Sequence, residues 1–225
     1  EFADGLMAQL TNLGGEVTYG KVISAQKTEN GFEVGTEDGE KYEGKNLIIA
    51  SGAAHRHLGI EREQELIGRG VSYCAVCDGP FFKEKTAAVV GGGSAALQDA
   101  LYLAGICSKV YLIHRRDTFR AEKSLIDQVM AAKNIECVME SRVTALIGEK
   151  KLTELEVTNL AGEKRTLLID GLFVAIGMEP HNEVFRDLVD LDEAGYVIAG
   201  ENCKTRTPGV YAAGDCRTKM VRQLT

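Results

Sequence analysis

The 225-residue sequence lacks the features of several large classes of proteins. It has no excess of positive charge, because 26 Lys and Arg residues stand against 33 Asp and Glu residues, giving a formal net charge of -7. Nucleic acids and anionic membranes bind basic surfaces, so we expect neither as a partner. No apolar run approaches the roughly 18 residues of a membrane-spanning helix, and we expect no signal peptide.

Cysteine is too sparse for a secreted scaffold held by disulfides. The six cysteines lie at positions 74, 77, 107, 137, 203 and 216, and only the first two are close together. This usage predicts a reducing cytoplasm with one catalytic pair, the other four being buried thiols that act as small hydrophobic residues. Methionine is also absent at position 1, so we expect further sequence before Glu1.

One layout occurs twice: a β-hairpin with a Gly-containing turn, then a buried strand ending in glycine. Its pieces are 30–34, 37–40 and 46–52 in the first copy, and 155–157, 160–163 and 171–177 in the second. Alternating side chains predict the hairpins, and continuous apolar runs predict strands covered on both faces. Such a repeat predicts an α/β protein with two related units.

Only the second copy completes a dinucleotide-binding pattern. Before it come a strand over 86–90, a glycine turn, a helix over 94–105, a strand over 109–114 and a helix over 121–133. The first copy lacks these opening elements, which we expect before Glu1. Another short strand, ending in Gly214-Asp215, follows the second unit. We therefore interpret the second unit as inserted into the first, with loop-like linkers over 53–59 and 177–182 forming a hinge.

The glycine turn predicts a dinucleotide site. Gly91, Gly93 and Ala96 fit the pattern G-x-G-x-x-A, in which the backbone approaches a pyrophosphate at the N-terminus of a helix that begins with Ser94 and Ala95. A purely structural turn is the alternative for such a short match. The strand before the turn and the amphipathic helix after it favour the dinucleotide.

The next predicted strand indicates which dinucleotide binds. About 20 residues after the turn, an NAD site carries an acidic residue for the ribose hydroxyl. Here the sequence has His114, Arg115 and Arg116, with Arg120 one helical turn further on. Guanidinium groups match a 2'-phosphate in charge and geometry, so NADPH is favoured over NADH. A solvated basic patch is the alternative, and the acidity of the rest of the chain disfavours it.

Cys74-Ala75-Val76-Cys77 has the spacing of an easily reduced disulfide, and Asp78 beside it can exchange the proton that dithiol chemistry moves. A zinc site is the alternative, but it needs two more ligands at similar spacing, and His55 and His57 suit a linker surface better. We therefore expect no metal. A flavin is the usual intermediary between nicotinamide and a disulfide, so the first unit is predicted to bind FAD, with Ala50, Ser51, Gly52, Gly214 and Asp215 at its edges.

With these residues assembled, the chain resembles the low-molecular-weight thioredoxin reductases over essentially its whole length. The matching segments are 74–80, 89–93, 114–121, 173–177, 209–215 and 222–223. The resemblance implies two Rossmann-like dinucleotide-binding units with β-meander insertions, the NADPH unit inserted into a partial FAD unit. FAD would bind residues 1–55 and 182–225, and NADPH would bind residues 56–181, which also carry the cysteine pair.

The resemblance also implies roles for individual residues. Cys77 would face the flavin, Cys74 would attack the thioredoxin disulfide, and Asp78 would be the acid–base. The remaining assignments follow the motifs: Arg115, Arg116 and Arg120 for the 2'-phosphate, Ile176 and Gly177 for NADPH, Asp215 for the ribityl chain, and Arg222 and Gln223 near the flavin. In this family the inserted domain swings on its two linkers, and the enzyme is a homodimer acting on thioredoxin.

Three departures from the family pattern are present. The first glycine-rich turn and the helix expected after Gln223 are absent, and Ser94-Ala95 replaces the more usual acidic or amide residue followed by a hydroxyl residue. Two alternatives to a thioredoxin reductase are open. One is the flavoprotein subunit of alkyl hydroperoxide reductase, which differs by extra thioredoxin-like modules upstream. The other is a non-catalytic NADP(H)-binding module.

Overall fold

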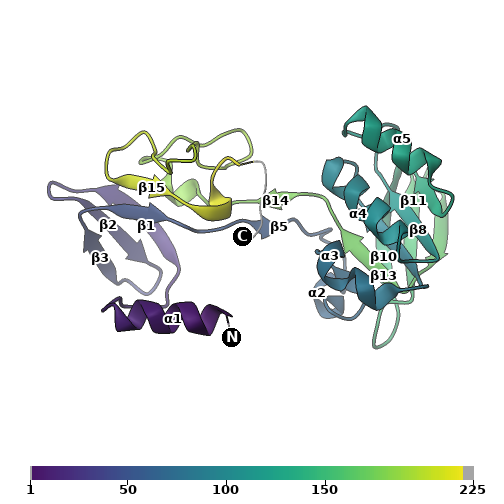
Figure 1. Cartoon of the computed structure of the whole chain (residues 1–225), viewed down its shortest axis with the longest axis horizontal. Coiled ribbons are helices and arrows are strands. Elements are labelled where there is room, and N and C mark those ends of the chain that lie inside the picture. The colour runs from purple at the N-terminus through teal and green to yellow at the C-terminus, as the bar shows by residue number, and fades with distance from the viewer. Residues whose placement is uncertain (1, 220–225) are drawn as a thin grey trace. The chain divides into compact units, whose positions relative to one another are not determined.

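The computed structural model describes residues 2–219, which form two compact units (Figure 1). The first unit combines Glu1–Ala54 with Glu179–Thr225, and the second is the continuous segment His55–Met178. Where the chain passes between the units, β5 (Ala54–His55) pairs with β14 (Met178–Glu179).

A five-stranded parallel sheet organises the second unit, in the order β6-β13-β7-β8-β9. Its strands are β6 (Val71–Ser72), β7 (Thr86–Val90), β8 (Lys109–Ile113), β9 (Ile135–Val138) and β13 (Gly171–Val174). Because all five run in the same direction, the loops that follow them leave at one edge of the sheet. Ligands of open α/β sheets bind at this carboxyl edge.

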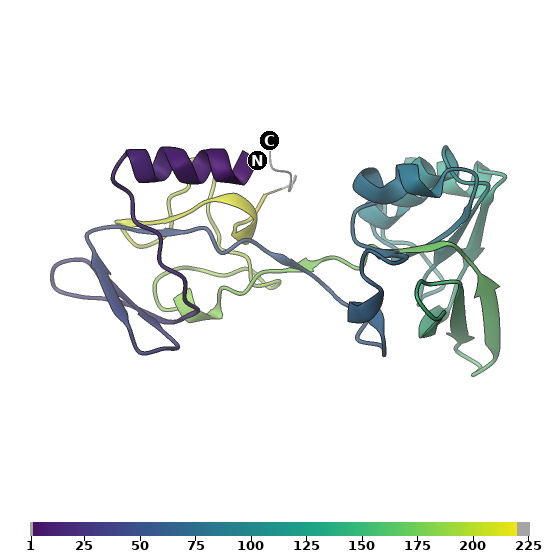
Figure 2. The same ribbon diagram turned by 90° about the horizontal axis from the view of Figure 1, so that it is seen from below.

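Both faces of the sheet are buried, as the continuous apolar runs predict. On one face, Ala87 and Val89 pack with helices α4 (Ser94–Ala104) and α5 (Lys123–Ala131). On the other face, Ala88 packs with an antiparallel meander of β10 (Ser141–Ile147), β11 (Glu154–Asn159) and β12 (Lys164–Leu168). Figure 2 shows α4 and the meander on opposite sides of the sheet.

Short helices complete this unit between β6 and β7 and ahead of β6. They are α2 (Glu63–Leu66), α3 (Ala75–Asp78) and the 3-10 helix η1 (Gly79–Phe82). The η1 segment is held against the sheet, because the ring of Phe82 packs edge-on against the ring of Phe173, with ring centroids 5.3 Å apart. This contact places the segment that follows the cysteine pair on a rigid support.

The first unit brings together the two ends of the described chain. Helix α1 (Phe2–Asn12) precedes an antiparallel meander of β1 (Val22–Lys27), β2 (Phe32–Thr36) and β3 (Lys41–Gly44). Strand β4 (Leu47–Ile49) then pairs in parallel with β15 (Val210–Ala212), and the 3-10 helices η2 (Glu183–Phe185) and η3 (Gly214–Cys216) flank this pair. Phe32, Ile49 and Phe185 lie in the common core.

The predicted α/β class with a parallel sheet is confirmed. The strand over 86–90 is β7, and the two predicted helices are α4 and α5, each slightly shorter than expected. Strand β8 ends at Ile113, so His114 already belongs to the loop after it. Asn182, which we placed at the end of a linker, is fully buried in the first unit, where its side chain bonds to the carbonyls of Gly195 and Cys216.

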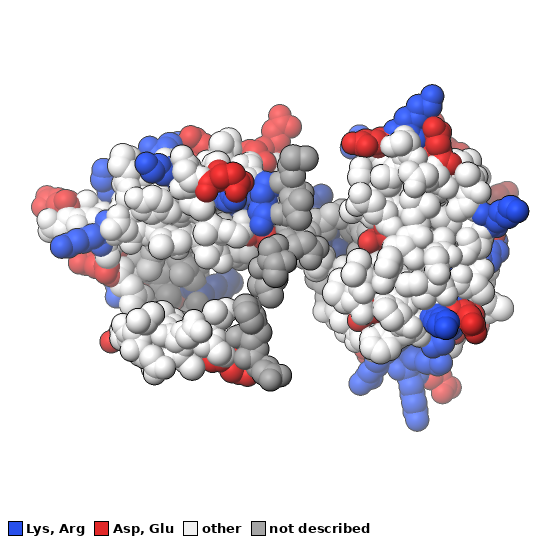
Figure 3. Space-filling model, viewed as in Figure 1, with Lys and Arg blue, Asp and Glu red and all other residues white. Residues whose placement is uncertain are grey.

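The surface carries charges of both signs. On the face shown in Figure 3, acidic and basic side chains are interspersed over each unit. Within residues 2–219, no helix has both the length and the apolar character of a membrane span.

Candidate functional site

The turn between β7 and α4 requires glycine because three backbones meet there. Gly91 has a φ of 155°, and a Cβ at this position would overlap the carbonyl oxygen of Ala175 and lie 2.6 Å from the Cβ of Ala96. The amide of Ala175 in turn donates to the carbonyl of Val90 at 2.8 Å. This packing joins the end of β7 to the end of β13, where Ile176 and Gly177 follow.

In contrast, Gly93 faces open space. A Cβ there would meet only the carbonyl oxygen of Arg120, at 3.9 Å. Gly93 is also the N-cap of α4, no side chain caps this helix end, and Ser94 and Ala95 in its first turn are exposed. The amide groups at the start of α4 are therefore accessible to an anion, which fits the predicted pyrophosphate of NADPH.

His114 supports the turn from beneath rather than facing solvent. Its imidazole lies against Gly92, where a Cβ would overlap the ring, and it stacks on Phe119 with ring centroids 5.5 Å apart. Burial, and then the positive charges of the nearby arginines, lower the pKa of His114. The neutral ring donates from Nε2 to the carbonyl of Thr118 at 3.1 Å.

The arginine loop is tied to the glycine turn through its backbone. The amide of Arg120 donates to the carbonyl of Gly92 at 2.6 Å. Arg115 and Arg120 are exposed and Arg116 is half-buried. Within residues 2–219, none of these three guanidinium groups has a salt bridge or side-chain hydrogen bond to another residue. Three unpaired cations beside a turn whose amide groups are open to an anion fit the 2'-phosphate that distinguishes NADPH.

Cys74 and Cys77 form a disulfide two residues beyond the end of β6, with their Cα atoms 5.3 Å apart. Cys74 is the N-cap of α3, and its Sγ accepts a hydrogen bond from the amide of Cys77 at 3.2 Å. Cys74 is half-buried and Cys77 is exposed. In the part of the chain that is described, no group of three metal-ligating side chains occurs, and these two sulfurs are bonded to each other.

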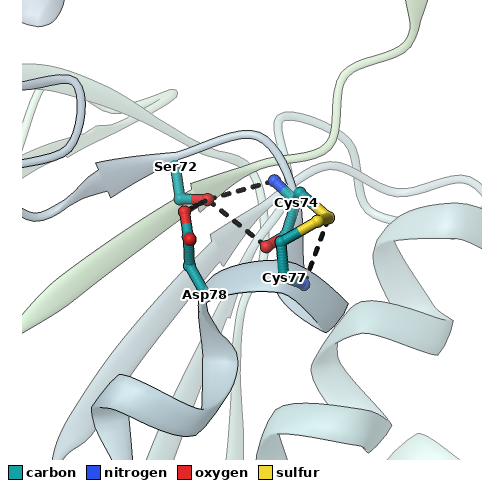
Figure 4. Close-up of a disulfide and its surroundings, with 4 residues drawn as sticks. All are labelled: Ser72, Cys74, Cys77 and Asp78. Carbon is teal, nitrogen blue, oxygen red and sulfur yellow. Dashed lines mark hydrogen bonds between the residues drawn. A yellow bond between two sulfur atoms is a disulfide. The ribbon is translucent and has the colours of Figure 1, made fainter. Parts of the chain in front are cut away.

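The carboxyl of Asp78 is held by a serine that the sequence motifs do not single out. Ser72 Oγ donates to Asp78 Oδ2 at 2.7 Å and accepts from the amide of Cys74 at 3.1 Å. Figure 4 shows Ser72, at the end of its strand, and Asp78, on the helical turn, pointing toward each other beside the disulfide. The only sequence signal is that Ser72 closes a strand just before the cysteine pair.

A second unpredicted group anchors the redox segment from its other side. Glu63 is only 3% exposed, and its carboxylate accepts the amides of Leu58 and Gly59 and the hydroxyl of Tyr73. The Tyr73 hydroxyl is also 2.6 Å from His57 Nδ1. Burial and the neighbouring Glu63 raise the pKa of Tyr73, so its hydroxyl stays protonated. Residues 57–59 of the predicted linker are thus connected by hydrogen bonds, directly or through Glu63, to Tyr73, the residue before Cys74.

In the first unit, the residues predicted for FAD gather at one edge of the β4–β15 pair. Ala50, Ser51 and Gly52 follow β4, and Gly214 and Asp215 follow β15. Because the strands are parallel, both segments leave at the same edge, and the amide of Ala213 bonds to the carbonyl of Ile49 at 2.9 Å. A Cβ at Gly52 or Gly214 would meet nothing within 4 Å. This open edge fits one side of a dinucleotide site, while Arg222 and Gln223 lie outside the described residues.

The comparisons with known proteins agree with this arrangement. Residues 5–225 match the family described as pyridine nucleotide-disulphide oxidoreductase. The chain belongs to this family. Within it, the chain is 37% identical over 226 residues to the thioredoxin reductase of Listeria innocua, covering 100% of this chain and 70% of that protein. The predicted resemblance to thioredoxin reductases is therefore confirmed.

Two further relatives place the chain among members of the family. The bifunctional thioredoxin reductase/thioredoxin of Mycobacterium leprae is 39% identical over 225 residues, which are 99% of this chain and 49% of that protein. The crystal structure of the thioredoxin reductase from Streptococcus pyogenes has a TM-score of 0.84 and 36% identity, and the match covers 99% of this chain and 73% of that one. The family likeness thus extends over both units.

Proposed function

We propose that this protein transfers electrons from NADPH, through FAD and the Cys74–Cys77 disulfide, to the disulfide of a thioredoxin. FAD and NADPH are the cofactors of this family. The observation that carries the proposal is the disulfide itself, which lies in the same unit as the predicted phosphate-binding turn and three unpaired arginines. Nucleotide and redox chemistry therefore share one rigid sheet.

We assign NADPH to residues 56–181. The pyrophosphate would meet the amide groups at Gly93, Ser94 and Ala95, and Arg115, Arg116 and Arg120 would hold the 2'-phosphate. Ile176 and Gly177, which are beside the turn at the end of β13, would contact the rest of the nucleotide. His114 would act by packing under the turn, since its ring is buried and its Nε2 hydrogen is already used.

FAD is assigned to residues 1–55 and 182–225. Ala50, Ser51, Gly52 and Gly214 would border it, and Asp215 would receive its ribityl hydroxyls. When bound, FAD accepts hydride from NADPH and passes two electrons to a disulfide. Cys77 is exposed, which agrees with its assignment as the flavin-facing thiol.

The reduced pair would then act on thioredoxin by thiol exchange. Reduction adds two electrons and two protons and gives the Cys74 and Cys77 thiols. The Cys74 thiol passes its proton to Asp78, and the thiolate attacks one sulfur of the thioredoxin disulfide while the other sulfur leaves and is protonated. Attack by Cys77 on the mixed disulfide releases reduced thioredoxin. The amide of Cys77, which bonds to Cys74 Sγ, favours the thiolate at the attacking position.

Exposed apolar side chains close to the cysteine pair in the sequence support a protein substrate. Val76, between the two cysteines, is 66% exposed, and Phe81 is 72% exposed. Exposed apolar residues gathered beside a reactive group are typical of docking surfaces.

We also propose a homodimer and a cytoplasmic location. Four of the six cysteines are free thiols, as expected for a reducing compartment.

A turnover assay tests this proposal. The chain, supplied with FAD, should bleach at the flavin bands when NADPH is added and should regain its absorbance when oxidised thioredoxin follows. Cys74→Ser should abolish thioredoxin reduction and leave NADPH binding intact. A fully active Cys74→Ser variant, or NADPH binding without any flavin uptake, would overturn the proposal.

The nucleotide preference is tested separately. Replacing Arg115 and Arg120 with Ala should weaken NADPH binding by about tenfold or more, because a charge-assisted hydrogen bond contributes about 1.5 to 3 kcal/mol. Binding of NADH should change little. Arg142→Ala, an exposed arginine on β10, is the matched control for loss of positive charge. Equal losses for both nucleotides would contradict the 2'-phosphate assignment.

A further inference from the structure

Ser72 occupies a position from which one hydroxyl reaches both reacting partners of the redox segment. Its oxygen accepts the amide hydrogen of Cys74 and donates its own hydrogen to the carboxyl of Asp78. Asp78 Oδ1 has no hydrogen bond to any residue within 2–219. One carboxyl oxygen is therefore fixed, and the other is available for proton exchange (Figure 4).

The sheet holds this hydroxyl in place. Ser72 is only 5% exposed and pairs with Phe173 in the parallel register of β6 and β13. Asp78, in contrast, lies at the last residue of a four-residue helix, and Cys74 at its N-cap. Ser72 is thus the link between a rigid strand and two groups on a short turn, which has few internal hydrogen bonds to fix it.

We propose that Ser72 is a positioning residue for disulfide exchange, which acts by fixing the Asp78 carboxyl relative to Cys74. The inference rests on the proposed function in one respect, the assignment of the proton to Asp78. Proton transfer by a placed carboxyl depends on its geometry relative to the sulfur. Loss of the Ser72 hydroxyl should therefore slow exchange while Asp78 itself remains.

Oxidation of the reduced chain by oxidised glutathione tests this step without either cofactor. The Cys74 thiolate attacks glutathione disulfide, one glutathione leaves, and Cys77 displaces the second. The protein dithiol and one glutathione disulfide become the protein disulfide and two glutathione thiols. The rate, followed by trapping free thiols from about pH 6 to about pH 9, spans the range in which thiols ionise.

Three variants separate positioning from simple support of the fold. Ser72→Ala should slow exchange by about tenfold or more near neutral pH, and Ser72→Thr, which keeps the hydroxyl, should restore it to within about threefold. Ser141→Ala removes a hydroxyl that is equally buried, at 6% exposure, and donates to the carbonyl of Met139. This control should exchange at the wild-type rate.

The decisive measurement is made in an Asp78→Asn background. If Ser72 acts through Asp78, adding Ser72→Ala to Asp78→Asn should slow exchange by less than about twofold, because coupled residues are not additive. A merely structural hydroxyl would give the same slowing in both backgrounds. Equal rates for Ser72→Ala and wild type, or fully additive losses, would overturn the inference.

If the alanine variant fails to fold, Ser72→Thr and Ser72→Val provide the same comparison. These two side chains have the same shape and differ in the hydroxyl, and both are β-branched residues, which suit a strand. NADPH-dependent reduction of thioredoxin is measured in parallel on the wild-type chain. Its failure would count against the proposed function, while the glutathione assay would still decide the role of Ser72.

Discussion

At the scale of single residues, the buried carboxylate of Glu63 provides the sharpest test of local stability. Its two oxygens accept the amides of Leu58 and Gly59 and the hydroxyl of Tyr73. Glu63→Ala would leave the two amides without this partner and the Tyr73 hydroxyl with His57 alone, so we expect a loss of about 2 to 3 kcal/mol in the free energy of unfolding of the second unit.

Urea unfolding measures this loss, and the same short helix offers the control. Glu65 pairs with Arg62 at 2.8 Å, but its side chain is 51% exposed. An exposed ion pair contributes little, so Glu65→Ala should change the free energy of unfolding by less than about 1 kcal/mol. Equal effects of the two substitutions would contradict the role given to Glu63.

Asp99, on α4, should make stability depend on pH. Burial raises the pKa of Asp99 from 3.8 to about 6. Since the folded state binds the proton more tightly than the unfolded state, the resulting stabilisation is complete below pH 3.8 and is lost as the pH rises through about 6. Asp99→Asn should therefore match the wild-type Tm in acid and exceed it above about pH 6.

Thermal unfolding across this range checks the Asp99 prediction. His114 titrates in the opposite sense, because burial lowers its pKa and its protonation opposes folding. It is present in both proteins, so the difference in Tm between them isolates Asp99. A constant difference at every pH would show that the carboxyl does not titrate differently on folding.

At the scale of elements, the turn before α4 contains one glycine that the fold requires, Gly92, and one that we expect only nucleotide binding to require, Gly93. A Cβ at position 92 would overlap the imidazole of His114, whereas one at position 93 would have only Arg120 within 4 Å. Gly92→Ala should lower the Tm and NADPH affinity together. Gly93→Ala should keep the Tm and weaken NADPH binding by about tenfold or more, because the backbone can no longer approach the phosphate.

Calorimetry with NADPH and thermal unfolding of both glycine variants provide the two readouts. The variants serve as controls for each other, since each adds one methyl group to the same turn. Unchanged NADPH affinity in Gly93→Ala would mean that the pyrophosphate binds elsewhere.

The elements that the sequence predicts well are those with a local signal. Strand β7 and helix α4 follow from an apolar run, three glycines and an amphipathic segment. Strand β9 and helix α1 have weaker signals, and we did not predict them. Ser72 and Glu63 were missed for a different reason. Their importance depends on partners brought near by the turn and by the packing of Tyr73, and no spacing in the sequence encodes those contacts.

At the scale of the whole molecule, the interrupted repeat carries more information than any single motif. It predicts that segments on both sides of the second unit belong together, and β4 pairs with β15 across some 160 residues of intervening chain. The repeat does not locate the boundaries, because those depend on which side chains are buried. Asn182 illustrates this, since the bonds of its side chain to Ser51, Gly195 and Cys216 tie it to the first unit.

Two separate cores predict two unfolding transitions. The first unit has its own core around Ile49 and Val197, and the second has cores on both faces of its sheet. Only two chain segments join the units, so each core can be lost without the other. Leu112→Ala should lower one transition and Val197→Ala the other, since both side chains are fully buried.

NADPH should then stabilise only the transition that Leu112→Ala lowers, because the glycine turn and the arginines belong to the second unit. At a free concentration of about 100 times the dissociation constant, the expected gain is about 2.7 kcal/mol. Differential scanning calorimetry with and without NADPH measures it. A single transition that both substitutions lower, or an equal gain in both transitions, would mean that the two units unfold as one.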